Sequence, residues 1–571
     1  MKALRFDHLY RYQELTEAIE SLATAHPELM TLESIGKSHE GRDIWLATVA
    51  NAATGPHHEK PALFVEANIH ATEVTASTAA LHLLHRLVTG YGDDADITRV
   101  VDTRCFYVVP RLNPDGVELA LADRPRFVRS STRAWPRPEL QDGLVEEDID
   151  GDGRILTMRV LDGNGPWKAS TEDPRLMVPR EPHEAGPGPF WRLLPEGTIR
   201  NYDGVLVPLA PRVEGLDLNR QFPAGWRTEG DQAGAGPYPG SEPEIAALLK
   251  AVAARPNVCS YIAYHTFSGV HLRPYSDRDD DQLPTSDLRT FEEIGKQATA
   301  ITGYKAVSVY HDFRYEPKEV ITGASDDWAY DHLGVYAWTT EFWSPISAAG
   351  IKDHKYIEWF DEHPVEDDLA LLRWSDETVG RNVGYVDWYP FEHPQLGEVE
   401  LGGWNFFRVW SNPPPALMEA EVAPHSEFAV RHLLMSPRLK LREASASRIG
   451  EPGEDGRSTW RVRVVVENSG WMATNITERA LERKAVRPLE AEISLPDGVT
   501  LAAGTARVEL GQLSGRALKR SALLASDPTR DRAKVEWVLA APAGAEVAVE
   551  IRHQRAGVVR LDVLLGVEEE A

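Results

Sequence analysis

Cysteine is almost absent from this sequence of 571 residues, which contains only Cys105 and Cys259. Two cysteines cannot supply the disulfide framework of a small secreted fold. Each lies within an apolar run, CFYVV or VCSYIAY, so we expect both to be buried, reduced thiols rather than catalytic groups.

Positive charge is also scarce. Lys and Arg together number 61 against 88 Asp and Glu, which gives a formal net charge of −27. Nucleic acids and anionic membranes bind basic surfaces, so this balance argues against either as the main partner and favours a solvated acidic surface. Hydrophobic and charged residues make up 42% and 26% of the chain, ordinary globular values that exclude wholesale disorder and fibrous folds.

Long apolar runs are missing as well. No stretch approaches the roughly 20 residues that a membrane helix needs, so we expect no membrane span. The first residues, MKALRFDHLYRYQEL, lack the apolar core of a signal peptide, which predicts a soluble, cytoplasmic protein. A chain that began after a removed signal would look the same and would be secreted.

The first two-thirds of the sequence alternate strand-like and helix-like segments. Because such alternation is typical of layered α/β folds, we expect a mixed, mostly parallel sheet flanked by helices. The strand-like runs are 44–49, 62–66, 105–110, 258–264 and 335–340, and the helical patterns are 11–24, 74–89, 243–254 and 286–301.

Three segments depart from this rhythm. Residues 134–212 are rich in Pro, Gly and acidic residues, and we interpret them as a long insertion made of loops. From 437 the chain is a series of short β-rich runs between turns, which predicts an all-β sandwich over 437–571. The segment 376–436 is expected to pack on the first domain, which would then span 1–436, and to connect it to the second.

A histidine and a glutamate three residues apart follow the strand-like run at 62–66. In PALFVEANIHATEVTAS, His70 and Glu73 come just before a helical pattern, where both side chains can face one point. Imidazole and carboxylate are both zinc ligands. Alone the pair is weak, since a helix-start Glu beside an incidental His explains it equally well.

Other strand or loop ends carry polar residues too. His265 ends the run VCSYIAYH, at the edge where open α/β sheets bind ligands. Glu341 closes VYAWTTE, where a buried acid is costly unless it is paired or functional. Asn219 and Arg220 in GLDLNRQFP offer a donor and a planar fork for a carboxylate. Taken singly, each has an ordinary structural explanation.

Taken together, these residues predict peptide hydrolysis. His70, Glu73 and His265 would leave one zinc position open for water, which is the catalytic form of a zinc site. Glu341 would act as general base on that water, and Arg220 would anchor a substrate carboxylate.

Seven segments, in order, resemble the M14 zinc metallocarboxypeptidases, the carboxypeptidase A-type family, over about residues 8–375. They are YRYQELTEAIESLATAHPELMTLESIGKSHEGRDI, HATE, PRLNPDG, GLDLNRQFP, YPGSEPE, YHTFSGVHLRPY and SDDWAYDHLGVYAWTTEFW. The resemblance implies the fold expected above and one zinc per chain, on His70, Glu73 and His265. It further implies that Asn219 and Arg220 hold the terminal carboxylate of the substrate.

The resemblance also implies roles for two further residues. Glu341 would be general base and then general acid. An arginine after the N-P-D-G turn would polarise the scissile carbonyl; in RFVRSSTR, Arg129 matches best, while Arg126 and Arg133 remain alternatives.

The sequence departs from the family pattern at two places. Thr72 stands where the family has an arginine, which weakens contacts beyond the terminal residue. The mobile active-site tyrosine is missing, because counting back from Asp327 places Glu319 there, with Tyr315 only a neighbour.

In the family, the residue two before the Trp of the Asp-Trp pair lines the pocket for the terminal side chain. Ungapped counting gives Asp326, whose carboxylate would favour Lys or Arg. Two alternatives stay open. Arg273 could neutralise Asp326, which would abolish or reverse the preference, or a one-residue shift could put Ser325 or Asp327 in its place.

The insertion contains DIDGDG, which looks like the first half of a calcium loop with ligands at Asp148, Asp150 and Asp152. The twelfth position is Arg159 rather than Glu, so an EF-hand is excluded. Calcium binding and a plain acidic turn both remain open.

We therefore expect a zinc-dependent metallocarboxypeptidase that removes C-terminal residues from peptides with a free terminal carboxylate. One alternative is an M14-type amidase or peptidase acting on unusual substrates, such as cell-wall γ-D-glutamyl peptides. Another is a binding pseudo-enzyme. The sequence sets no oligomeric state.

Overall fold

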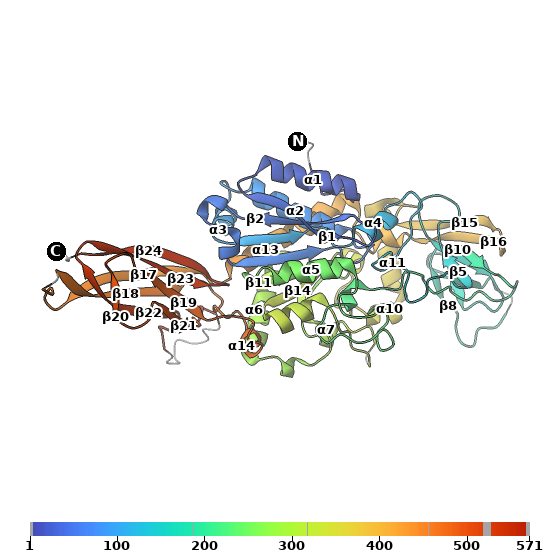
Figure 1. Ribbon diagram of the computed structural model, residues 1–571. Coiled ribbons are helices and arrows are strands. Elements are labelled where there is room, and N and C mark those ends of the chain that lie inside the picture. Colours follow the sequence, from blue (N-terminus) through green and yellow to red (C-terminus); the bar gives the residue numbers. More distant parts are fainter. Residues whose placement is uncertain (1–3, 187, 317, 455, 518–526, 567–571) are drawn as a thin grey trace.

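An eight-stranded mixed sheet forms the centre of the molecule in this computed structural model (Figure 1). The structure describes residues 4–186, 188–316, 318–454, 456–517 and 527–566. In sheet order the strands are β1 (Met30–Lys37), β2 (Asp43–Val49), β4 (Cys105–Val109), β3 (Ala62–Ala67), β11 (Val258–Thr266), β14 (Tyr336–Phe342), β12 (Val270–Arg273) and β13 (Lys305–Ser308).

The middle of this sheet is parallel and buried. β4, β3, β11 and β14 run parallel to one another, and every residue of β3, β4 and β11 is buried. Strands covered on both faces read as continuous apolar runs, which is why the sequence identified them. Both cysteines lie here, reduced, and burial raises the pKa of Cys105 to about 12.

Helices cover the sheet where the apolar periodicity predicts them. The four expected helices are α1 (Tyr12–Ala25), α2 (Thr75–Thr89), α5 (Pro243–Ala253) and α6 (Thr285–Thr302). In α1 the buried side chains include Leu15, Ala18, Ile19 and Leu22, the apolar stripe of the sequence. Helix α13 (Pro415–Leu434) packs against α2 and α6, so the segment 376–436 does lie on the first domain. Within the described residues, no helix is both long and apolar enough to cross a membrane.

The interpretation of 134–212 as loops is wrong. This insertion contains β5 (Gly143–Glu146), β6 (Thr157–Leu161), β7 (Trp167–Ala169), β8 (Met177–Pro179), β9 (Trp191–Pro195) and β10 (Gly197–Arg200). β5 pairs with β10, and the other four join β15 (Tyr385–His393) and β16 (Gly397–Trp404) in a six-stranded sheet. Leu144, Met158, Ile199, Val399 and Leu401 form its small buried core. The segment 376–436 is therefore more than a connector, since it completes this sheet.

The C-terminal region is the predicted all-β sandwich. One sheet has the order β17 (Leu439–Ile449), β18 (Arg457–Asn468), β22 (Arg532–Pro542), β20 (Thr500–Ala503), and the other β21 (Arg507–Gly511), β19 (Leu489–Ser494), β23 (Ala545–His553), β24 (Gly557–Leu565). Alternate residues of β18 point inward, and Trp460, Trp537 and Ile551 belong to the shared core. A domain boundary at 436/437 stays a prediction.

Candidate active site

The turn after β3 brings the first two candidate ligands to the carboxyl edge of the sheet. Asn68 adopts a left-handed conformation, φ 60°, that turns the chain. Its side chain donates to the His70 carbonyl (2.6 Å) and accepts from the Ser77 hydroxyl of α2 (2.8 Å). Glu73 is tied to β11, because the Thr266 backbone N–H donates to its carboxylate (3.1 Å).

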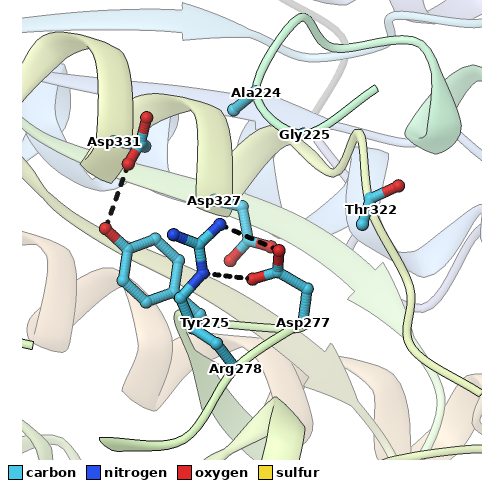
Figure 2. A pocket seen from close by; sticks show the side chains of 8 residues that line it. All are labelled: Ala224, Gly225, Tyr275, Asp277, Arg278, Thr322, Asp327 and Asp331. Atoms are coloured by element: carbon cyan, nitrogen blue, oxygen red, sulfur yellow. Dashed lines mark hydrogen bonds and ion pairs between the residues drawn. The ribbon is translucent and has the colours of Figure 1, made fainter. Parts of the chain in front are cut away.

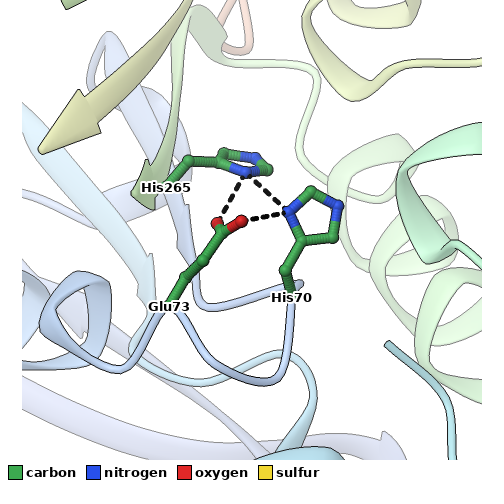
Figure 3. A group of neighbouring side chains, drawn as sticks. All are labelled: His70, Glu73 and His265. Carbon is green, nitrogen blue, oxygen red and sulfur yellow. Dashed lines mark hydrogen bonds and ion pairs between the residues drawn. The ribbon is translucent and has the colours of Figure 1, made fainter. Parts of the chain in front are cut away.

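His70, Glu73 and His265 converge on one buried point (Figure 3). The Nδ1 atoms of the two histidines are 3.1 Å apart, and they lie 2.8 Å (His70) and 3.0 Å (His265) from the two Glu73 oxygens. Ligand atoms bound at about 2.0–2.1 Å in a tetrahedral zinc site are themselves roughly 3.3 Å apart. The donor set, its spacing and its burial therefore fit zinc.

Two further acidic residues, Asp217 and Glu66, lie close to this group. Asp217 accepts from His70 Nε2 (3.1 Å), which fixes the imidazole with Nδ1 toward the ligand cluster. Burial acts to raise the pKa of Asp217, but Arg220, Arg129 and His70 together hold it well below its usual range. Asp217 lies in the segment GLDLNRQFP, two residues before Asn219, and this position was the only sequence signal for its role.

Glu66 of β3 is the second acid, and it is fully buried. Burial raises its pKa to about 7, while the nearby His265 acts to lower it. An acid inside the otherwise apolar strand ALFVEA was the sequence signal for it.

The structure separates the three candidate arginines. Arg129 lies at the metal group, with its Nε donating to Asp217 (3.1 Å) and an Nη to Glu73 (3.3 Å). Arg126 instead pairs with Glu214, and Arg133 with the buried Glu242. Arg129 is therefore the only one of these three that contacts the ligand cluster.

Asn219 and Arg220 lie in the short helix η3 (Leu218–Arg220) next to Asp217. The Asn219 Oδ1 accepts from the backbone N–H of Ser325 (2.9 Å), so this side chain ties η3 to the segment that begins at Ser325. Arg220 donates to the Asn219 carbonyl (2.8 Å) and lies 3.9 Å from Asp217.

Glu341 is placed by strand register. In the parallel pair β11–β14 it is the direct partner of His265, so it stands at the same edge of the sheet as the metal group. Burial raises its pKa to about 8; His265 and Arg129 act in the opposite direction, and Glu73 and Asp326 add to the rise.

That the family's tyrosine is missing stays a prediction, but Tyr315, the neighbour of the counted position, lies near the arginines of the site. Tyr315 is 49% exposed, yet it is close enough for Arg129 and Arg220 to lower its pKa and for Glu341 to raise it, against a larger upward effect of burial.

Asp326 is buried in α8 (Ser325–Trp328), 2% exposed, and its pKa is raised by burial, with His265 and Thr339 acting against the rise. The alternative in which Arg273 neutralises Asp326 is wrong, because Arg273 pairs with Asp280 (2.7 Å). Among the described residues, no ion pair to Lys or Arg involves Asp326 or Glu66.

Only two of the three predicted calcium ligands come together. Asp148 and Asp150 lie near Glu196, whereas the Asp152 carboxylate accepts from the backbone and side chain of Arg154. Backbone N–H groups within the same turn donate to Asp148, and two more donate to Glu196. The acidic Gly turn accounts for these contacts, and calcium finds no support.

The chain matches the models of two known protein families. The family model described as zinc carboxypeptidase, peptidase M14, matches residues 15–347. The chain belongs to this zinc-dependent family, because the match covers more than half of its 571 residues. A second model, a domain of unknown function (DUF8731), matches residues 438–564, the β-sandwich.

Individual relatives are distant. Zinc carboxypeptidase of Saccharothrix mutabilis subsp. capreolus is 32% identical over 126 residues, 22% of this chain and 27% of that protein. Carboxypeptidase B of Astacus astacus is 25% identical over 338 residues, 58% of this chain and 84% of that protein. A solved carboxypeptidase A from Helicoverpa armigera has a TM-score of 0.39 and 18% identity, covering 66% of this chain and 76% of that one.

Proposed function

We propose that the protein is a zinc-dependent carboxypeptidase that removes C-terminal residues from peptides. The observation that carries this proposal is the His70–Glu73–His265 cluster with Glu341 in register beside it. A bound zinc would supply Lewis-acid polarisation of the scissile carbonyl and would acidify a water molecule.

The residues of the chain supply the proton transfer. Glu341 takes the proton of the attacking water and returns it to the leaving amine, which is the role of a general base that becomes a general acid. Partial burial and the neighbouring Glu73 and Asp326 favour the protonated form, so Glu341 is suited to hold a proton between the two steps. Arg129 stabilises the charge that develops on the carbonyl oxygen.

Arg220 recognises the free terminal carboxylate. Its guanidinium is only 12% exposed and stands next to Arg129, and no carboxylate is closer to it than Asp217 at 3.9 Å among its ion pairs in the described residues. A planar fork in this position matches a carboxylate bidentately. Asn219 helps indirectly, by tying Arg220's helix to Ser325.

The terminal side chain is a basic one in this proposal. Asp326 and Glu66 are buried carboxylates near His265, and a cationic side chain would offset the cost of their burial. The amidase with unusual substrates is the alternative that a missing tyrosine and the long insertion would favour, and Tyr315 near Arg129 and Arg220 counts against the first of these two grounds.

Glu341→Gln tests the proposal directly. Purified wild type should contain about one zinc per chain, which His70→Ala or His265→Ala should lose. Glu341→Gln should retain zinc but lose about 10²–10⁴-fold in turnover of a blocked dipeptide. Cleavage of the matching C-terminal amide at an equal rate, or near-normal turnover by Glu341→Gln, would contradict the assignment.

A further inference from the structure

The C-terminal β-sandwich contacts the catalytic region next to the segment that carries Asp326. Helix α8 continues without a break into the π-helix η5 (Ala329–Leu333), and η5 is followed by Gly334. The short helix α14 (Glu478–Glu482) of the C-terminal region packs on η5. The sandwich therefore touches the chain only a few residues beyond the proposed pocket.

Asp331 of η5 is the centre of this contact. Its side chain is 8% exposed, and both of its oxygens are engaged by arginines of the C-terminal region, Arg479 (Nε, 3.1 Å) and Arg483. These arginines keep the pKa of Asp331 below its usual range, although burial acts to raise it. Two arginines on one largely buried carboxylate restrict its position far more than a surface ion pair would.

A second carboxylate reinforces the same contact. Asp287 of α6 is 1% exposed and accepts from the backbone N–H groups of Glu478 (2.9 Å) and Arg479 (3.1 Å). It also accepts from the hydroxyl of Tyr330, the residue beside Asp331 (2.9 Å). Asp287 thus joins α14, η5 and α6.

Residues of the C-terminal region also bind the backbone at the end of η5. The Gly334 carbonyl accepts from the Thr477 hydroxyl (2.9 Å) and from Arg555 (3.2 Å). Gly334 has φ 63°, and a Cβ there would stand 2.4 Å from the Cα of Ala480. Only glycine permits this approach of the two chains.

Hydrogen bonds from Tyr275 and Ser276 connect Asp331 to Asp327, the residue next to Asp326. The Tyr275 hydroxyl donates to Asp331 (3.1 Å), and the backbone N–H of the next residue, Ser276, donates to both Asp327 oxygens (3.1 Å each). Figure 2 shows Tyr275, Asp331 and Asp327 around one small cavity. That cavity has about 10 Å³ of free space, about what one water needs.

We infer that Arg479 and Arg483 are positioning residues for the proposed terminal-residue pocket. They hold Asp331 of η5, and through it they fix the position of the adjoining helix α8. This inference rests on the proposed function for its kinetic consequence. It gives the β-sandwich a specific task, which is to hold Asp326 and the Ser325 N–H in place opposite Asn219. The metal ligands and Glu341 lie outside α8 and η5, so the chemical step should be spared.

The test uses full-length protein carrying Arg479→Ala with Arg483→Ala. KM for whichever dipeptide wild type cleaves, among those ending in Arg, Glu or Phe, should rise roughly two- to thirtyfold with kcat nearly unchanged. Deuterium exchange over residues 322–334 should become faster. Arg560→Ala is the matched control, because Arg560 is an arginine of the same sandwich that pairs with Glu59 of the 3-10 helix η2 (His57–Glu59), outside α8 and η5.

Each outcome decides the matter. Unchanged KM and unchanged exchange in the double variant would overturn the inference, as would equal changes in Arg560→Ala. If the double variant does not fold, Asp331→Asn, which keeps the side-chain shape, takes its place with the same expectations. If wild type cleaves no peptide, the proposed function fails, and exchange over 322–334 alone decides the inference.

Discussion

Asp217 links two groups of the site through one carboxylate. It accepts from His70 on one oxygen and from Arg129 on the other, so it orients a proposed zinc ligand and the arginine proposed to face the scissile carbonyl. A carboxylate behind a metal-binding imidazole sets its tautomer and raises its basicity. Its removal should therefore be visible in metal binding itself and not only in turnover.

We predict that Asp217→Asn lowers zinc affinity by about 10–100-fold. The measurement is competition with a chelator at fixed pH, which needs no substrate. Asp115→Asn is the matched control, because Asp115 is also buried but pairs with Arg42 and not with a residue of the metal group. Equal zinc affinity in Asp217→Asn and wild type would show that His70 needs no such support.

Asp326 sets the expected preference among terminal side chains. We predict that wild type has its highest kcat/KM on a blocked dipeptide ending in Arg, compared with matched dipeptides ending in Glu and Phe. Asp326→Ala should lose that advantage, because the carboxylate that pairs with the cation is gone. Two results would refute the pocket assignment: no preference for Arg in wild type, or an unaltered ranking in the variant.

At the scale of elements, the insertion sheet is the part of the fold that the sequence did not predict, although its strands share a small buried core. β6 lies between β9 of the insertion and β16 of the later segment, with Met158 opposite both Leu194 and Leu401. Met158 is fully buried, whereas Leu161 on the same strand is 68% exposed. Truncation of each of these two side chains on one strand therefore compares a buried position with an exposed one.

Met158→Ala should lower the free energy of unfolding by about 2–5 kcal/mol, the usual cost of truncating a buried methionine. Leu161→Ala should change it by about 0.5 kcal/mol or less, as exposed positions do. Urea unfolding followed by tryptophan fluorescence measures both, since Trp191 and Trp404 lie in this sheet. Similar values for the two variants would mean that the insertion sheet does not contribute to cooperative stability.

At the scale of the whole molecule, acid stability is limited by histidines in the core. His271, His425 and His432 are buried between β12 and α13, with ring contacts that link them to one another and to Phe428. Burial lowers the pKa of His271 and His432 to about 3, and it lowers that of His425 well below its usual range. The folded protein therefore excludes protons that the unfolded chain accepts near pH 6.5.

Because these folded-state pKa values are depressed, the free energy of unfolding should fall as pH drops below about 6.5. We predict a loss of roughly 1–2 kcal/mol per histidine by pH 5, from denaturant titrations across this range. His432→Leu should reduce that slope, because it removes one of the buried titrating groups. The substitution breaks no hydrogen bond, since neither ring nitrogen has a partner within the described residues. His39→Leu, at an exposed position, should leave it unchanged, and an identical slope in both variants would contradict the prediction.

Much of the fold and site was predictable because it depends on local patterns. Buried parallel strands such as β3 and β11 are continuous apolar runs, and HATE places two ligands at the end of one of them. The insertion sheet could not be predicted as a whole, since its strand β6 pairs with β16, which lies far along the chain. The sequence left Arg273 open as a partner of Asp326, because a count along the chain does not show that Arg273 pairs with Asp280.

The pairing of β6 with β16 also constrains how the chain is made. About 235 residues separate Leu161 from Gly397, and strands β11 to β14 of the central sheet are encoded in that interval. If synthesis adds about 5–20 residues per second, β16 is completed roughly 10–50 s after β6. During that time its apolar face, which includes Met158, has no partner strand on the β16 side. The nascent insertion is thus the part of this protein that a chaperone would have to shield.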